Sequence, residues 1–384
     1  MSARPQTARI APAAAPPPLR ILHVIWWGEI GGIALNLVDL ALHCRARNHV
    51  MEVCVLTRSS HLIDALAAQD VRVWEMHARS GRDLLAFGRV YRLLRRERYD
   101  VVQDHTGNLL AASAILLGAH GARTVHQEHG AINIPRLERR KRVFYRLFGA
   151  RFDRFIAVSP KAADEMIRAG AARERIETIA TPVDPVRFSP QQSRQEAKRT
   201  LGLPETALTV GTACRFAPEK DLDLFLQVAL LIRSRRPEIR FVMVGGGEES
   251  ERLRQVAHDL GILPAIVFTG MRSDMTTVWR AFDVYLFTSR VEAFPRTLLE
   301  SLACETPVVA AVPIAGGAID IVRDSPGILS VADRDPERLA AESVRLLDAP
   351  VVREEAGRRG RQWVIEHYHV TKWIEALDDL YRRR

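Results

Sequence analysis

Two glutamates in the C-terminal third of the chain, Glu292 and Glu300, have a spacing that restricts their chemistry. They stand eight positions apart, on either side of an expected helix start. Eight residues of helix rise about 12 Å, whereas the two carboxyl groups of a glycoside hydrolase lie roughly 5 to 9.5 Å apart. Part of the run is loop, which shortens the distance. The spacing favours one elongated ligand held at two distant places, such as a nucleotide diphosphate sugar, over a pair that acts on one bond.

Two cations, Arg215 and Lys220, lie in a second segment suited to chemistry. They follow an apolar strand that ends near Cys214 and precede a helix that begins near Leu222. Such a loop lies at the carboxyl edge of a parallel sheet, where open α/β folds bind ligands. Positive groups aimed at a departing nucleoside diphosphate stabilise its developing charge. We therefore expect these side chains to replace a divalent metal ion, and we predict neither a metal nor a cofactor.

These two segments carry a resemblance to a known family. The run 289–300, followed by Thr306-Pro307-Val308-Val309, resembles the Glu-x7-Glu signature of retaining glycosyltransferases of family 4, which have the two-domain GT-B fold. The loop with Arg215 and Lys220 resembles the phosphate clamp of the same family. The likeness extends from about residue 20 to the C-terminus. The chain departs from the usual pattern of the family at three positions. It has Ala293, Ser301 and Glu305 where the family commonly has Gly, Ala and Gly, respectively.

The resemblance implies a role for each of these side chains. Glu292 would orient the sugar ring, and Glu300 would accept hydrogen bonds from the ribose hydroxyls. Arg215 and Lys220 would hold the diphosphate, assisted by N–H groups at the helix start near Phe294. Arg215, Lys220 and Glu292 are thus predicted to be catalytic, together with a histidine described next, whereas Phe294 and Glu300 are predicted to bind the donor.

The N-terminal half contains a glycine pair and two histidines at expected strand ends. Gly31 and Gly32 precede a helix, where glycine lets backbone N–H groups approach a phosphate. The pair resembles the loop that faces the donor across the cleft. His129 ends a strand, and in the resembled family a histidine before such a glycine reaches the donor sugar. His105 ends a neighbouring strand and is a candidate for the acceptor side.

Three further expectations concern strand ends and backbone geometry in the C-terminal half. The glycine run 245–247 ends a strand and is predicted to need positive φ angles. Met271 and Arg272 follow another strand, where the resembled family places the nucleotide base. Glu305 stands where glycine often takes the left-handed conformation after a helix that runs from Arg296 to about Cys304.

The elements that must position these residues alternate between short β-branched runs and longer amphipathic runs. This alternation predicts parallel sheets covered by helices on both faces. We predict an α/β protein of the GT-B class, in which two Rossmann-like, doubly wound domains face each other across a cleft. The expected parts are a disordered tail over 1–18, an N-terminal acceptor-side domain over 19–184, a linker over 185–206, a donor-binding domain over 207–368, and a C-terminal helix over 369–384 that crosses back to the first domain.

Composition limits the function classes. The chain has 384 residues, 47% hydrophobic residues and a net charge of +9, which suits two globular domains and anionic ligands. The four cysteines form no CxxC pair, and no apolar stretch approaches the ~20 residues of a membrane span. We expect a cytoplasmic protein. The basic run Arg136–Arg154, which includes Phe144 and Phe148, suits either an anionic membrane surface on the inner face or a solvated helix.

The predicted function is retaining, metal-independent transfer of a sugar from a nucleotide diphosphate sugar to a glycan or lipid-linked acceptor. One alternative is a nucleotide-sugar epimerase or hydrolase of the same fold, which would need a general acid or base that the sequence does not single out. Another is a catalytically degenerate GT-B binding subunit, which is compatible with the departures from the family pattern at Ala293, Ser301 and Glu305. Nucleic acid is not an expected partner, since no aromatic stacking platform accompanies the positive charge.

Overall fold

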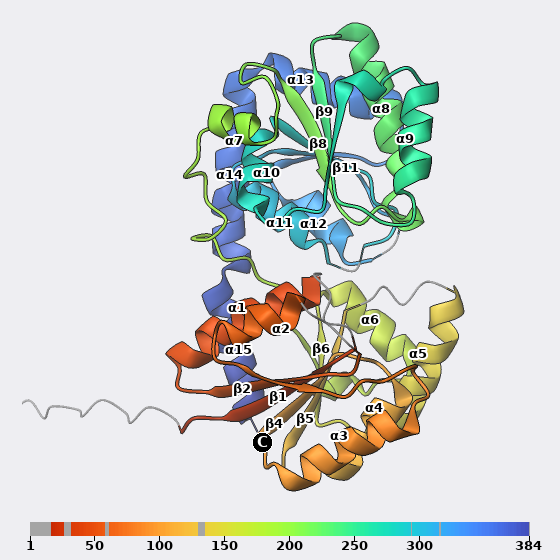
Figure 1. Cartoon of the computed structure of the whole chain (residues 1–384), viewed down its shortest axis with the longest axis vertical. Helices are drawn as coiled ribbons and strands as arrows, with labels where there is room; N and C mark the ends of the chain where they lie inside the picture. Colours follow the sequence, from red (N-terminus) through yellow and green to blue (C-terminus); the bar gives the residue numbers. More distant parts are fainter. Residues whose placement is uncertain are drawn as a thin grey trace, which may run out of the picture.

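Two parallel β-sheets, each covered by helices, form the two halves of the molecule (Figure 1). The computed structural model describes residues 17–26, 32–57, 61–129, 135–292, 294–314 and 316–383. Within these residues the first sheet has the strand order β3-β2-β1-β4-β5-β6-β7 and the second has the order β10-β9-β8-β11-β12-β13. In both sheets the order reverses beside the first strand, as in doubly wound folds. The predicted fold class is confirmed.

The N-terminal sheet is buried on both faces by alternate side chains of its central strands. Leu22 and Val24 of the first strand enter one apolar core, whereas Ile21 and Ile25 enter the core on the opposite face, as the two-residue period of a strand requires. The strands are β1 (Arg20–Ile25), β2 (Val50–Val55), β3 (Arg72–Glu75), β4 (Val101–Asp104), β5 (Arg123–Glu128), β6 (Arg154–Ala157) and β7 (Ile176–Thr178), and the helices are α1 (Gly32–Ala46), α2 (His61–Ala67), α3 (Leu84–Arg96), α4 (Leu109–Gly118), α5 (Pro135–Phe148) and α6 (Pro160–Ala169).

The C-terminal sheet is built in the same way. Its strands are β8 (Thr209–Ala213), β9 (Arg240–Val244), β10 (Ile266–Gly270), β11 (Val284–Phe287), β12 (Val308–Ala311) and β13 (Ile328–Val331), and its helices are α7 (Arg194–Thr200), α8 (Leu222–Arg235), α9 (Ser250–Asp259), α10 (Met275–Ala281), α11 (Arg296–Ala303), α12 (Ala318–Asp324), α13 (Pro336–Asp348) and α14 (Pro350–Tyr368). The short β-branched runs of the sequence predict all of these strands except β7 and β13, which are short, partly exposed strands at the sheet edges.

Several helices begin at side chains that cap them. Asp83 accepts hydrogen bonds from the N–H groups of Leu85 and Ala86 at the start of α3. Ser193 and Glu196 form a reciprocal capping box at the start of α7. Such caps satisfy N–H groups that have no partner within the helix. They fix where each helix starts, and therefore the length of the loop before it.

The segment between the domains and the chain end differ in detail from the sequence expectation. The region 185–206, expected to be a linker, contains α7, and its Phe188, Ala197 and Leu201 are buried in the C-terminal core. The helical conformation is interrupted at His369, between α14 and the last helix. The N–H of the next residue, Val370, donates a hydrogen bond to the carbonyl of Val183. The last helix, α15 (Val370–Arg382), packs its apolar side in the N-terminal core, at Val370, Trp373, Ile374, Leu377, Leu380 and Tyr381.

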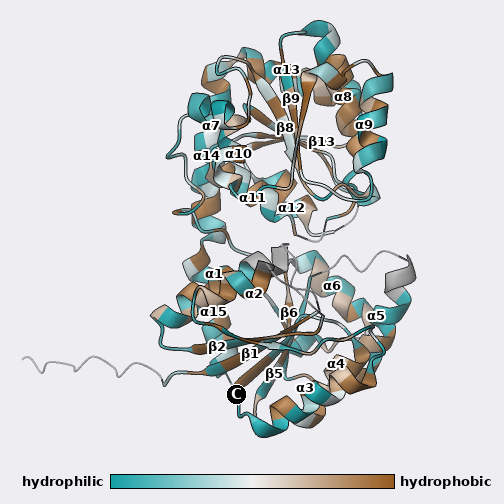
Figure 2. Cartoon of the chain, viewed as in Figure 1, coloured by the Kyte–Doolittle hydropathy of each residue, from teal (hydrophilic) through white to brown (hydrophobic). Residues whose placement is uncertain are grey.

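Hydropathy follows these layers (Figure 2). Apolar residues gather on the strands, and polar residues cover the outer turns of helices such as α9. Among the described residues, no helix combines the length and the apolar content that crossing a bilayer requires. The expected tail over 1–18 lies outside the described residues up to residue 16, and Pro17 and Pro18 are exposed.

Candidate active site

Lys220 and Glu292, which are 72 residues apart in sequence, form an ion pair. Lys220 belongs to a short 3-10 turn, Pro218–Lys220, that follows β8, and Glu292 follows β11. Strands β8 and β11 are parallel neighbours, so both loops leave the sheet at its carboxyl edge. The structure thus brings together two of the side chains that the sequence predicted to be catalytic.

Hydrogen bonds between the two loops hold this pair in place. The hydroxyl of Thr288 donates to the carbonyl of Lys220 at 2.9 Å, and the N–H of Arg290 donates to the carbonyl of Glu219 at 2.9 Å. Burial by itself would lower the pKa of Lys220, but the charge and hydrogen bond of Glu292 outweigh burial and raise the pKa. The ammonium group therefore keeps its charge at neutral pH.

Arg215 lies in the same loop but is more open to solvent. Its side chain is 66% exposed, and its guanidinium forms an ion pair with Glu219 at 2.5 Å. Gly245 and Gly247 support this loop with φ angles of +131° and +153°, as predicted for the glycine run. A Cβ atom at Gly245 would lie 1.9 Å from the carbonyl oxygen of Cys214. Glycine is therefore required for the β9–α9 turn to pack against the Arg215 loop.

A second glycine turn, at Gly316 and Gly317, supports Glu292 and was missed by the sequence reasoning. Gly316 has a φ of +103°, and a Cβ atom there would lie 1.9 Å from the carbonyl oxygen of Glu292. The N–H of Ala318 donates to the same oxygen at 3.3 Å. The signal was present in the sequence, because a Gly-Gly pair follows a strand and precedes a helix there, as it does at Gly31 and Gly32.

Glu300 is in a different environment from the one expected. Its side chain is buried; Oε1 accepts from Nε of Arg296 at 2.6 Å and Oε2 accepts from Nε1 of Trp279 at 3.3 Å. Burial raises the pKa of Glu300, and Arg296 opposes that rise. Both carboxylate oxygens are thus engaged within the protein. Each carboxylate oxygen can accept a second hydrogen bond, so the predicted contact with ribose stays a prediction.

Arg296 links this glutamate to the N-terminal half. Its Nη2 lies 2.7 Å from Oδ2 of Asp39 in α1, and its Nη1 donates to Oδ1 of Asn36. Phe294, two residues earlier, packs against the apolar cores of both halves. The segment from Phe294 to Glu300 therefore lies where the two halves meet, and Glu292 borders that junction.

His129 follows β5 at the carboxyl edge of the N-terminal sheet. Its Nε2 lies 2.7 Å from Nδ1 of His105, and Nε2 of His105 lies 3.0 Å from Nδ1 of His23. Burial lowers the pKa of His129 to about 4, so the ring is neutral at pH 7. Both nitrogens of His105 are occupied by other histidines, which leaves its ring no free nitrogen for the predicted acceptor contact.

The remaining predicted donor residues lie at the rim or outside the described part of the chain. Met271 is 84% exposed, and a Cβ atom at Gly246 would come within 3.8 Å of its Cγ. Arg272 forms an ion pair with Asp274 at 2.6 Å. Gly32 is the first residue of α1. Gly31 lies outside the described residues.

Comparisons with known proteins decide the family. The model for glycosyl transferases group 1 matches residues 193–363, and the model for Glycosyltransferase Family 4 matches residues 30–187. The D-inositol 3-phosphate glycosyltransferase of Stackebrandtia nassauensis is 31% identical over 308 residues, which cover 73% of this chain and 67% of that relative. The chain belongs to glycosyltransferase family 4.

Other relatives of this family 4 protein match over shorter stretches. The D-inositol 3-phosphate glycosyltransferase of Acidothermus cellulolyticus is 36% identical over 224 residues, or 56% of this chain, and the match spans about half (49%) of that relative. Among solved structures, HepE of Anabaena in complex with UDP-glucose has a TM-score of 0.82 at 20% identity, covering 94% of this chain and 98% of that one. WaaG, a glycosyltransferase involved in lipopolysaccharide biosynthesis, has a TM-score of 0.76 at 16% identity, covering 95% and 100%. These likenesses show the two-domain fold.

Two more arginines surround the loop of this family 4 protein that contains Arg215 and Lys220. Arg290 and Arg334 both lie 2.8 Å from Oδ2 of Asp221, and Arg334 also donates to the carbonyl of Ser289. The sequence reasoning overlooked both, because the contacts join residues 69 and 113 positions apart. They make the carboxyl edge of the C-terminal sheet more cationic than Arg215 and Lys220 alone.

The chain contains two Asp-x-Asp sequences, 221–223 and 333–335, a pattern that carries a divalent cation in some transferases. Here Asp221 binds the two arginines just named, and Asp223 binds Arg252 at 2.8 Å. Asp333 binds Arg338 at 2.6 Å. Within the described part of the chain, no three histidine, cysteine or carboxylate side chains are grouped so that they could hold a metal ion.

Proposed function

We propose that this family 4 protein is a retaining glycosyltransferase that moves a sugar from a nucleotide diphosphate sugar to a glycan or lipid-linked acceptor, without a metal ion. The observation that carries the proposal is the Lys220–Glu292 pair at the carboxyl edge of the C-terminal sheet, beside the junction with the other half. It combines a charged ammonium group with a carboxylate in one place. A diphosphate needs the first group, and sugar hydroxyls need the second.

The proposed reaction uses these groups as follows. The bond between the sugar carbon and the diphosphate oxygen breaks, and the electron pair stays on the diphosphate. Lys220, with Arg215 and Arg290 nearby in the two loops, stabilises the added negative charge. The acceptor hydroxyl attacks the same face, and its proton passes to the departing phosphate oxygen. Glu292 holds the ring while positive charge develops on it.

The names of related proteins support the donor class. HepE binds UDP-glucose, and the curated relatives act on D-inositol 3-phosphate. A UDP sugar is therefore the first donor to test, and a phosphorylated polyol joins glycan and lipid-linked compounds as an acceptor to test. The two alternative functions would give different results. An epimerase or hydrolase would alter or hydrolyse the sugar nucleotide without an acceptor, and a binding subunit would bind it without turnover.

A thermal-shift screen against UDP-, GDP-, ADP- and TDP-linked sugars tests the donor. Ligand at a hundred times its Kd stabilises the folded state by about 2.7 kcal/mol, so a true donor raises the melting temperature clearly. Transfer is then measured as the rate at which the nucleoside diphosphate is released, with and without EDTA, and we expect equal rates. No shift with any sugar nucleotide, or loss of activity in EDTA, would contradict the proposal.

Replacing Arg215 and Lys220 tests the mechanism. Because they stabilise the leaving group, Arg215→Ala with Lys220→Ala should lower kcat by about two to three orders of magnitude. The matched control is Arg235→Ala with Arg236→Ala, which removes an exposed and a half-buried arginine at the far end of α8 and the same net charge. Near-normal turnover in the first variant, with intact folding, would remove these side chains from the mechanism.

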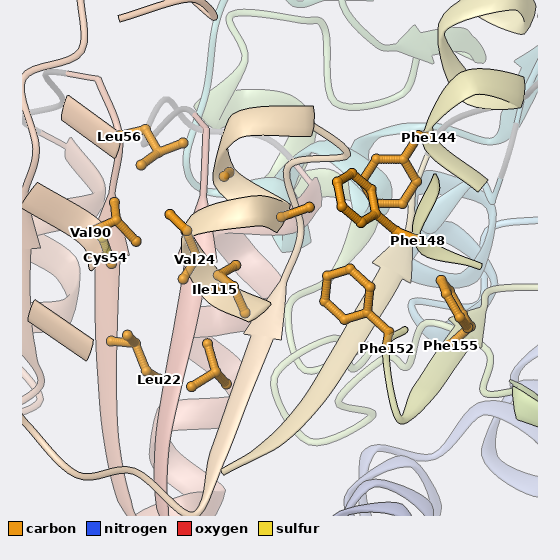
Figure 3. Packing of buried hydrophobic residues seen from close by; sticks show 14 of the residues in the cluster. Leu22, Val24, Cys54, Leu56, Val90, Ile115, Phe144, Phe148, Phe152 and Phe155 are labelled. Carbon is orange, nitrogen blue, oxygen red and sulfur yellow. The ribbon is translucent and has the colours of Figure 1, made fainter. Parts of the chain in front are cut away.

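The helix α5 supports a narrower proposal, peripheral contact with an anionic membrane surface. Phe144 and Phe148 point into the N-terminal core rather than outward (Figure 3). Val143 and Leu147, however, are 47% and 49% exposed on the same helix. Exposed arginines flank them, so the outer face of α5 combines apolar and positive groups, as a surface that rests on anionic lipid requires.

A further inference from the structure

Three histidines form a row across three adjacent strands of the N-terminal sheet. His23 lies in β1, His105 directly follows β4 and His129 directly follows β5, in the strand order β1-β4-β5. Nδ1 of His23 faces Nε2 of His105 at 3.0 Å, and Nδ1 of His105 faces Nε2 of His129 at 2.7 Å. The same pair of atoms is therefore used at both contacts. We call these three residues the histidine row.

Burial makes all three rings neutral. It lowers the pKa of His23 to about 3 and that of His129 to about 4, and it lowers the pKa of His105 well below its usual value, with help from the neighbouring histidines. A neutral imidazole carries one N–H and one bare nitrogen. Each contact between two nitrogens needs one proton. The three rings must therefore share one tautomer, either Nδ1–H throughout or Nε2–H throughout.

The buried end of the row decides between the two. His23 is fully buried, and its Nε2 has no hydrogen-bond partner among the described residues. With Nε2–H throughout, that nitrogen would be an unpaired buried donor, and unpaired buried N–H groups are rarer in proteins than unpaired acceptors. With Nδ1–H throughout, the only unpaired group there is a lone pair. The second arrangement is therefore the less costly one.

We propose that His23 and His105 are positioning residues, which hold neutral His129 with a bare Nε2 toward the protein and with Nδ1–H as the group offered to a ligand. His129 then acts in glycosyl transfer as a hydrogen-bond donor and not as a base. No proton leaves the row. The inference rests on the proposed function for its catalytic meaning, but the tautomers themselves do not depend on the identity of the substrate.

The tautomers can be observed directly in the ligand-free protein. Long-range 1H–15N correlation spectra of histidine-labelled protein at pH 7.5 distinguish protonated from bare ring nitrogens, and single substitutions assign the signals. We expect protonated Nδ1 and bare Nε2 in His23, His105 and His129 alike. A His129 with Nε2–H, or with a mixture of tautomers, would overturn the proposal whatever the protein catalyses.

A matched pair of variants tests the positioning role. His105→Leu and His105→Asn have nearly the same shape, but the Asn amide can still donate to Nε2 of His129. With the best sugar nucleotide from the thermal-shift screen as the probe, His105→Leu should lower kcat about tenfold, the equivalent of one hydrogen bond, while KM for that donor changes less than twofold. His105→Asn should recover most of the loss, and its His129 should keep Nδ1–H.

Equal losses in the Leu and Asn variants, or full activity in His105→Leu, would overturn the positioning role. Failure of the proposed function looks different. If no sugar nucleotide binds but the three tautomers match, the donor assignment falls and the histidine row stands. If a donor binds and turns over while His129 carries Nε2–H, the reverse holds.

Discussion

At the scale of single residues, the side chains predicted to form the site have different surroundings. Lys220 and Glu292, both predicted to be catalytic, form an ion pair. Glu300, in contrast, is buried against Arg296 and Trp279. A Glu300→Gln change would therefore disturb a buried ion pair as well as any ribose contact, and loss of nucleotide affinity alone would no longer isolate one cause. Gly316 is a cleaner probe of the site, because it touches the backbone of Glu292.

Gly316→Ala should lower stability and turnover together. The new methyl group would overlap the carbonyl oxygen of Glu292, and the residue would keep a positive φ that only glycine adopts easily. We expect a loss of about 1 to 3 kcal/mol in the free energy of unfolding, measured by chemical denaturation, and a fall in kcat. Gly202→Ala is the control, since it also has a positive φ but nothing within 4 Å of the added Cβ. Equal effects of the two changes would show that the Glu292 contact is unimportant.

At the scale of elements, the loops at the carboxyl edges of the two sheets carry the candidate chemistry, and the helices behind them fix where those loops start. The α5 helix shows how one element can serve two purposes. Its Phe144 and Phe148 fill the N-terminal core beside Phe152, which follows the helix, and Phe155 of β6 (Figure 3). An aromatic face directed at lipid, one alternative that the sequence left open, is therefore wrong for Phe144 and Phe148. Among the described side chains of α5, the exposed apolar ones are Val143 and Leu147.

Removing positive charge from α5 should weaken binding to anionic vesicles. Arg139→Gln, Arg140→Gln and Arg146→Gln remove three exposed charges from the helix, and each basic residue near such a surface contributes about 1 kcal/mol. Co-sedimentation with vesicles that contain phosphatidylserine measures the effect, and we expect at least a tenfold loss of affinity. A variant with Arg323, Arg358 and Arg359 changed to Gln, all exposed on the C-terminal half, is the charge-matched control. Equal binding by both variants would leave α5 as an ordinary solvated helix.

At the scale of the whole molecule, a few contacts join the two halves near the candidate site. The most buried of them is the link from Glu300 through Arg296 to Asp39, with Arg187 on the other oxygen of Asp39 at 3.0 Å. The crossing of α15 into the N-terminal core adds a second connection. Glu300, the side chain predicted to bind the ribose, is part of the first link. If that prediction holds, donor binding and the contact between the halves share the guanidinium group of Arg296.

A double-mutant cycle measures that link. Arg296→Met and Asp39→Asn should each destabilise the protein, and their combined effect should fall short of the sum by about 1 to 3 kcal/mol, because the second change finds its partner already gone. Thermal or chemical denaturation gives the four free energies. The exposed pair Arg252 and Asp223 is the control, with an expected coupling below about 1 kcal/mol. Additive effects at Arg296 and Asp39 would mean that the link adds no stability.

The sequence alone determined the strands of the two sheet centres, the two-domain class and the residue types of the loop after β8, because hydrophobic period and glycine placement are local properties of the chain. It also predicted the left-handed backbone at Glu305, where φ is 58°. Tertiary structure decided what those side chains meet. The histidine row, the arginines around Asp221, the glycine turn under Glu292 and the contact of Arg296 with Asp39 all join residues far apart in sequence. Such contacts depend on how strands are ordered and how the halves dock, and no local pattern encodes either.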